Sequence, residues 1–236
     1  MLPILDKNQF YKLTRLVAIV SLLMKLVKPS LPVTFNFPDD TRKLFESEDT
    51  INGYKVENIT LTSDSLEGTN LSESLFNKVD FTQTYVNRFD VTDCEFRGCN
   101  FTAAKFPESS WHRVSIDAAR CSGLQVTNAT LKNVDFRNSK LEIVNFRFSR
   151  LENVAFEDCV LNDVDFYDAQ LKNVEFVNCT INKITFASAR MMNVDISKSF
   201  VEALNGTSSL RGVTISHDQL LQLAPSFAAE AGIKIK

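Results

Sequence analysis

The chain has 236 residues, a formal net charge of −3, 44% hydrophobic residues and 23% charged residues. This composition is typical of a folded globular chain that is long enough to bury a core, and it excludes a disordered one. The near-neutral charge argues against a direct nucleic-acid binder, because phosphate contacts need clustered Lys and Arg.

Residues 1–30 carry apolar residues at helical spacing, from Leu13 through Leu16, Val20 and Leu23 to Val27. Pro29 ends the predicted helix, and later prolines indicate an extended connection. The longest apolar run is too short for a membrane span of about 20 residues, and no signal-peptide cleavage site follows it. We expect an N-terminal capping segment over 1–50, with membrane association through 13–28 as the alternative.

Residues 51–201 repeat with a period of five. Every fifth residue from Ile51 to Val201 is Ile, Leu, Val, Phe, Met, Trp or Cys. A helix would spread these side chains over all its faces, and a straight strand would turn every second one to water. One shared core therefore requires the backbone to turn a corner about every five residues and to coil around its own interior, as a solenoid does.

A second inward position lies two residues before each centre and is small or β-branched. From Val134 to Leu171, Val at this position precedes Phe, whereas Ser, Cys or Ala precedes Leu, which keeps the core volume steady. An Asn column at twenty-residue spacing indicates four sides per coil; its members are Asn133, Asn153, Asn173 and Asn193. With coils about 4.8 Å apart, the repeat forms a rod about 36 Å long.

These repeats resemble the pentapeptide-repeat family, whose consensus is A-(D/N)-L-x-x. The matching segments include 134–136, 144–146, 164–166, 129–131 and 194–196. The resemblance implies an all-β solenoid, a right-handed quadrilateral parallel β-helix, which we place at 51–204. Lys140, Arg150, Gln170 and Arg190 depart from the consensus before the centre, which changes surface charge and leaves the fold expectation in place.

Residues 205–236 predict a short C-terminal helical segment. Ser216 and Gln219 form a capping box, Pro225 is expected to interrupt the helix and start a second one, and Gly232 to stop it before a short strand. This end resembles the gyrase-associated family members, in which it forms the homodimer contact; the alternative is a cap on its own rod. The candidate dimerisation residues are Leu220, Leu221, Leu223, Phe227 and Ile233.

Residues with the potential for chemistry are few, and none forms a recognisable catalytic, metal or cofactor site. The five cysteines, Cys94, Cys99, Cys121, Cys159 and Cys179, fall at inward positions, so we expect reduced core thiols, although Cys159 and Cys179 stack within disulfide reach. The two histidines lie far apart in the sequence, and no Gly-rich phosphate loop is present. We expect no enzyme, no metal and no cofactor.

Two outward features predict partner binding. An acidic stripe precedes the bulky centres at Asp135, Asp165, Glu175 and Asp195. Exposed apolar and aromatic residues lie beside an arginine, a combination typical of protein-contact hot spots; these residues are Ile143, Arg147, Phe148 and Tyr167. The alternative for the second feature is scattered surface hydrophobics.

We therefore expect a bacterial, cytoplasmic, non-enzymatic rod that binds a protein and forms a homodimer. The family resemblance implies one specific partner, because some members imitate DNA, bind the type II topoisomerases DNA gyrase or topoisomerase IV, and protect them from quinolones. A rod of about 36 Å matches roughly one DNA turn, but basic residues dilute the phosphate-like charge. The alternative is a scaffold of unknown partner that is membrane-associated through 13–28.

Overall fold

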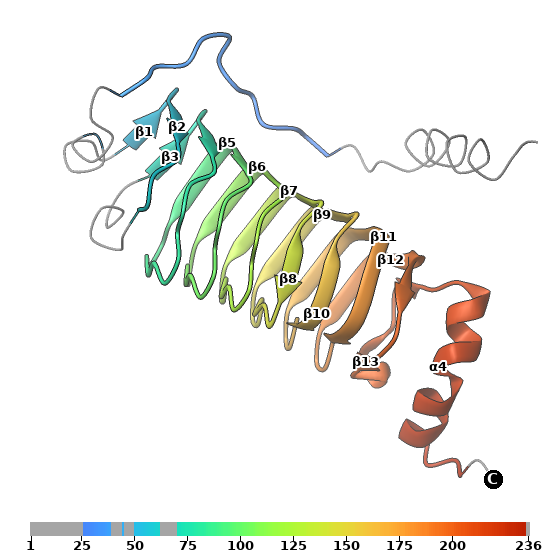
Figure 1. Cartoon of the computed structure of the whole chain (residues 1–236). Coiled ribbons are helices and arrows are strands. Elements are labelled where there is room, and N and C mark those ends of the chain that lie inside the picture. Colours follow the sequence, from blue (N-terminus) through green and yellow to red (C-terminus); the bar gives the residue numbers. More distant parts are fainter. Residues whose placement is uncertain (1–25, 39–43, 45–49, 62–69, 235–236) are drawn as a thin grey trace, which may run out of the picture.

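The computed structural model describes residues 26–38, 44, 50–61 and 70–234. These form a parallel β-solenoid, in which each coil stacks on the one before it (Figure 1). The strands are β1 Thr50–Asn52, β2 Lys55–Glu57, β3 Asn70–Ser72, β4 Leu75–Asn77, β5 Asp90–Arg97, β6 Ser110–Asp117, β7 Thr130–Arg137, β8 Lys140–Glu142, β9 Arg150–Glu157, β10 Val160–Asp165, β11 Gln170–Thr185, β12 Arg190–Val201, β13 Leu204–Asn205 and β14 Val213–Thr214.

The coil length is twenty residues, as predicted. Asp90 of β5 pairs with Ser110 of β6, and Thr130 of β7 pairs with Arg150 of β9, all in parallel register. The remaining sides pair through isolated parallel bridges such as Asn100 with Arg120 and Lys105 with Gln125, also twenty apart. Each coil therefore has four sides, and each side hydrogen-bonds to its equivalent one coil away.

The predicted corners are left-handed backbone positions. Every non-glycine residue with positive φ has a number ending in 3 or 8, and its φ lies between 47° and 61°. This conformation is disfavoured for residues with a Cβ and least so for Asn and Asp, which explains the Asn column. The column side chains also bond to one another, with Asn173 Nδ2 donating to Asn153 Oδ1 at 2.9 Å and Asn193 Nδ2 to Asn173 Oδ1 at 2.9 Å.

The core consists of stacked phenylalanine columns. Phe136, Phe156 and Phe176 form one vertical pile, with ring centroids 5.1 and 4.7 Å apart and planes within 7° of parallel. A second pile runs through Phe146 and Phe166 at 5.1 Å, and its rings meet the first edge-on. All five rings are fully buried, so the expectation that side chains five apart share one interior is confirmed.

The serines among the small inward residues have hydrogen-bond partners, as Ser149 shows. Ser149 is buried, its hydroxyl donates to the Val126 carbonyl at 2.7 Å, and it accepts from the Ala129 amide at 3.0 Å. The five cysteines are all free and buried, as expected. Burial raises the pKa of Cys99 to about 11 and that of Cys121 to about 12, so these side chains are neutral thiols that pack in the core.

The C-terminal end of the solenoid is closed by helix α4, His217–Glu230, after a 3-10 turn at Thr207–Ser209 (Figure 1). The predicted capping box of Ser216 and Gln219 is present. Gln219 also covers the open strand edge, because its Nε2 donates to the Ile196 carbonyl at 2.7 Å and to the Ser199 carbonyl at 2.6 Å. Leu223 is 2% exposed and packs on the core.

Two C-terminal expectations are wrong. Pro225 does not interrupt the helix, which continues through it to Glu230; the fixed φ of proline suits a helix, although proline donates no backbone hydrogen bond and its ring crowds the preceding turn. Ile233 and Lys234 do not form a strand. Gly232 adopts φ 74°, and the Ile233 amide turns back to the Ala228 carbonyl at 2.8 Å, which ends the helix in the manner expected of glycine there.

An extended strap, residues 26–38, runs along the outside of the rod (Figure 1). Asn36 bonds to both Gly53 and Lys55 in the first described coil, at 2.8 and 3.0 Å. The Ser30 amide donates to Asp93 Oδ1 at 2.9 Å, two coils further on. The predicted N-terminal helix lies almost wholly outside the described residues, and the described part of it, 26–28, is not helical.

Replacement of Phe146 by Ala tests the phenylalanine piles. The ring stacks on Phe166 and its removal leaves a cavity in a rigid core, so we expect the free energy of unfolding to fall by about 3–5 kcal/mol. Phe148→Ala is the control, because Phe148 lies two residues away and is half exposed. Urea denaturation followed by circular dichroism measures both, and equal losses would contradict the assignment of inward and outward positions.

Candidate functional site

Two neighbouring corners of one coil hold residues that do not suit the corner backbone. Ile143 has φ 54° and Phe148 has φ 61°. A β-branched or bulky residue in this region is strained. The same side chains are 68% and 50% exposed, so burial does not compensate for the strain. Backbone strain of this kind is concentrated at functional sites, so the side of the rod between these two corners is a candidate functional site.

An aromatic and cationic cluster is built on these corners. Tyr167 lies one coil above Arg147, as the twenty-residue register predicts, and the guanidinium carbon is 5.5 Å from the Tyr167 ring centre. The Phe148 ring meets Tyr167 edge-on at 5.8 Å. We call Ile143, Arg147, Phe148 and Tyr167 the corner cluster. The sequence correctly placed Arg147, Phe148 and Tyr167 together, and Ile143 is exposed at the preceding corner, as expected.

Hydrogen bonds hold the corner cluster in place. Arg147 donates to Asp165 at 2.7 Å, and the other oxygen of Asp165 accepts from the Tyr167 amide at 2.8 Å. The Phe148 amide donates to the Tyr167 carbonyl at 3.0 Å. Asp165 therefore orients the cluster from within, which is a different role from the partner contact that its place in the acidic stripe suggested.

The predicted acidic stripe is not a continuous surface. Asp135 is 2% exposed: Ser115 donates to it at 3.0 Å, Lys28 of the strap reaches it at 3.4 Å, and Arg137 pairs with its other side at 2.7 Å. Asp135 is thus a structural ion-pair centre under the strap, and its assignment as a partner contact is wrong. The sequence offered no signal for this, because the strap is far away along the chain.

Glu175 is also withdrawn from the surface. It is 8% exposed, and burial raises the pKa of its carboxyl above the ordinary value even though Lys198 is close enough to lower it. Its assignment as a partner contact is wrong for the same reason of burial. Asp195 is half-buried, and one of its oxygens accepts from the Ser197 amide at 2.8 Å.

The candidate dimerisation residues separate into two groups. Leu220, Leu221 and Ile233 are exposed at 45%, 64% and 61%. Leu223 is buried and Phe227 packs partly against the core, because α4 turns this face to the last coil. Leu223 is therefore a structural residue and not a dimer contact.

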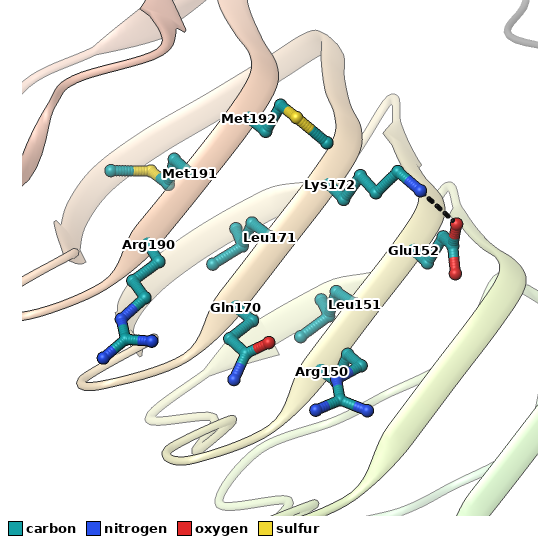
Figure 2. Close-up of a pocket in the computed structure, with 9 residues that line it drawn as sticks. All are labelled: Arg150, Leu151, Glu152, Gln170, Leu171, Lys172, Arg190, Met191 and Met192. Carbon is teal, nitrogen blue, oxygen red and sulfur yellow. Dashed lines mark hydrogen bonds and ion pairs between the residues drawn. The ribbon is translucent and has the colours of Figure 1, made fainter.

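A groove that the sequence did not predict lies on the outer face of β9, β11 and β12 (Figure 2). It holds about 240 Å³. One wall is the column Arg150, Gln170 and Arg190, and the other is Glu152, Lys172 and Met192. The departures from the family consensus before the centre, Arg150, Gln170 and Arg190, were the available signal, but they became a groove wall only when stacked at twenty-residue spacing.

The groove is electrostatically positive. Lys172 pairs with Glu152 at 2.8 Å, and this hydrogen bond, with the nearby charges of Lys132 and Arg150, lowers the pKa of Glu152. Neither Arg150 nor Arg190 has an ion-pair partner within the described part of the chain. The groove therefore presents the guanidinium groups of Arg150 and Arg190, unpaired among the described residues, together with the ammonium group of Lys172, which is paired with Glu152.

Other kinds of site are not formed by the described residues. Their His, Cys, Asp and Glu side chains do not gather in groups of three or more that could hold a metal ion. Within the same ranges, none of the helices has the length and hydropathy of a membrane span. The expected membrane segment at 13–28 falls mostly on residues outside these ranges.

Comparisons with known proteins find one family model that matches part of the chain and several solved structures that are similar to it. Residues 89–166 match the family model described as a pentapeptide repeat region. A trypsin-treated form of QnrB1, a plasmid-mediated fluoroquinolone resistance protein, is 15% identical over 79% of this chain and 100% of its own, with a TM-score of 0.41. HetL of the cyanobacterium Nostoc sp. strain PCC 7120, a pentapeptide repeat protein involved in heterocyst differentiation regulation, is 11% identical over 90% and 94%, also at 0.41. No curated protein matches the sequence.

Ile143→Gly tests the strain at the corner cluster. Glycine adopts positive φ freely and the isoleucine side chain is mostly exposed, so we expect the free energy of unfolding to rise by about 1 kcal/mol. Ile143→Val is the control, because it keeps the branched Cβ and the strain. Urea denaturation of both variants makes the comparison; a glycine variant no more stable than the valine variant would remove the strain argument.

Glu175→Gln tests the burial of this carboxyl. A folded-state pKa above the unfolded one contributes stability that is present at acidic pH and is lost as pH rises through the folded value. The glutamine variant should therefore unfold at higher urea concentration than the parent at neutral pH, and at the same concentration well below pH 4.5. Glu157→Gln, one coil earlier, is the matched control. If the glutamine variant were more stable than the parent by the same amount at acidic pH, its higher stability would have a cause other than the buried charge.

Proposed function

We propose that the chain, a member of the pentapeptide-repeat family, is a non-catalytic rod that binds another protein through the corner cluster. The observation that carries this proposal is the pair of exposed apolar residues, Ile143 and Phe148, at adjacent left-handed corners. Asn, Asp or Gly fills most of the equivalent corners with less strain. A role outside the folding of the rod accounts for side chains that cost stability and gain little burial.

The chemistry of the corner cluster suits a protein partner. Arginine and tyrosine are enriched among the residues that contribute most to interface affinity, and here they are already paired with each other. Asp165 and the backbone bonds fix the cluster before binding, so little side-chain entropy remains to be lost on association. The Phe148 ring can then be desolvated by a partner at low cost.

The specific partner that we propose is a type II DNA topoisomerase, DNA gyrase or topoisomerase IV. Its support is the shape of the rod, which spans roughly one turn of DNA at about 4.8 Å per coil. Charge does not add to it, since Asp135 and Glu175 are buried and leave gaps in the acidic stripe. We also propose that the rod works in the bacterial cytoplasm as a homodimer, with the contact narrowed to the exposed Leu220, Leu221 and Ile233.

Affinity capture with the purified chain tests the corner cluster. The double variant Phe148→Ser/Tyr167→Ser should lose partners that the parent chain retains, because both exposed rings are gone. Phe200→Ser is the matched control, since Phe200 is equally exposed on another side of the rod and should leave capture unchanged. Partners retained by the double variant, with its circular dichroism intact, would contradict the proposal.

A gyrase supercoiling assay tests whether a type II topoisomerase is the partner. The parent chain, the double variant and Phe200→Ser are each added, with and without a quinolone. The parent chain and Phe200→Ser should change the activity or its drug sensitivity, and the double variant should not. No effect of the parent chain would exclude gyrase and leave the protein-binding role to the capture result.

A further inference from the structure

The groove on β9, β11 and β12 is a second surface with its own chemistry, on the side of the rod next to the corner cluster. Its long axis follows the rod, because its walls are columns of side chains stacked one coil apart (Figure 2). The centre residues between the walls, such as Leu151 and Leu171, turn their side chains into the core. Strand backbone and the partly exposed Met191 therefore form the floor, and Met191 and the outward side chains decide what the groove binds.

Positive charge runs along the groove and beyond its end. Lys132, Arg150, Lys172 and Arg190 lie on four successive coils of this side, and Glu152 is the one carboxylate among their neighbours in these two columns. At about 4.8 Å per coil the four cations extend over about 14 Å. One phosphate or carboxylate can neutralise only part of such a row, whereas a linear polyanion matches it along its whole length.

The non-ionic part of the groove favours a peptide over a nucleic acid. Single-stranded nucleic acids bind to aromatic side chains on which their bases stack, and no residue that lines this groove is aromatic. The lining offers instead the exposed Met192, an adaptable apolar surface for aliphatic side chains, and the Gln170 amide, which can bond to a peptide backbone.

We propose that this groove binds an extended acidic segment of another protein. Its carboxylates pair with Arg150 and Arg190, two guanidinium groups of the groove that have no ion-pair partner among the described residues. Arginine presents a planar fork of donors that matches a carboxylate. An aliphatic residue of the segment packs on Met192. This goes beyond the corner-cluster contact, because it involves other residues, another side of the rod and an ionic mode of recognition.

The test is fluorescence anisotropy with a short fluorescein-labelled peptide of glutamate and leucine. The parent chain should bind it, and salt should weaken the complex. Arg150→Glu/Arg190→Glu should weaken it at least about tenfold, since two ion pairs become repulsions. Lys105→Glu/Arg120→Glu is the matched control: it changes the net charge equally on two other sides of the rod, and it should leave the affinity within about twofold. Circular dichroism melts confirm that both variants fold.

Three results would overturn this proposal. The first is that the parent chain fails to bind the peptide. The second is that both double variants lose affinity for the peptide to the same extent, which would show that the peptide is attracted by net charge alone. The third is that an oligothymidylate of equal charge, or inorganic phosphate in competition, binds the groove more tightly than the peptide, which would assign it to nucleic acid or to a small anion. None of these results bears on the corner cluster, because Phe148 and Tyr167 are intact in every variant.

Discussion

The structure depends on one backbone constraint, the left-handed corner that recurs at nearly every fifth residue of the described coils. Each corner turns the strand direction so that the next centre again faces the interior, and φ stays within 47–61° at all the non-glycine corners. Because the corners recur with the same period as the sequence repeat, inward-facing positions remain inward and outward-facing positions remain outward along the rod. The phenylalanine piles, the satisfied inner serines and the Asn column are consequences of this regularity.

The same constraint turns the outside of the rod into columns. A residue on one coil lies directly beside the residue twenty positions later in the sequence. Surface side chains that are far apart in the sequence therefore form columns along the rod. Arg147 and Tyr167 meet in this way, and Arg150, Gln170 and Arg190 form one column by the same register. The corner at Phe148 separates these two surfaces, which places the corner cluster and the positive groove on adjoining sides of one rod.

Segments outside the repeat modify these columns. The strap buries Asp135 with Lys28, and helix α4 closes the last coil through Gln219 and Leu223. A carboxylate taken out of water needs partners, and Asp135 has Ser115, Lys28 and Arg137. The acidic stripe expected from the register is therefore partly internal structure, and the exposed charge on the rod is different from the charge that the sequence columns suggest.

By itself, the sequence determined the solenoid, its twenty-residue coil, the inward positions and the meeting of Arg147, Phe148 and Tyr167, because each follows from periodicity and a fixed register. Only the tertiary structure decided the burial of Asp135 and Glu175, the inward face of α4 at Leu223 and the existence of the groove. Burial depends on what packs over a side chain, and a groove depends on the shapes of several columns together. Neither is a property of spacing along one chain.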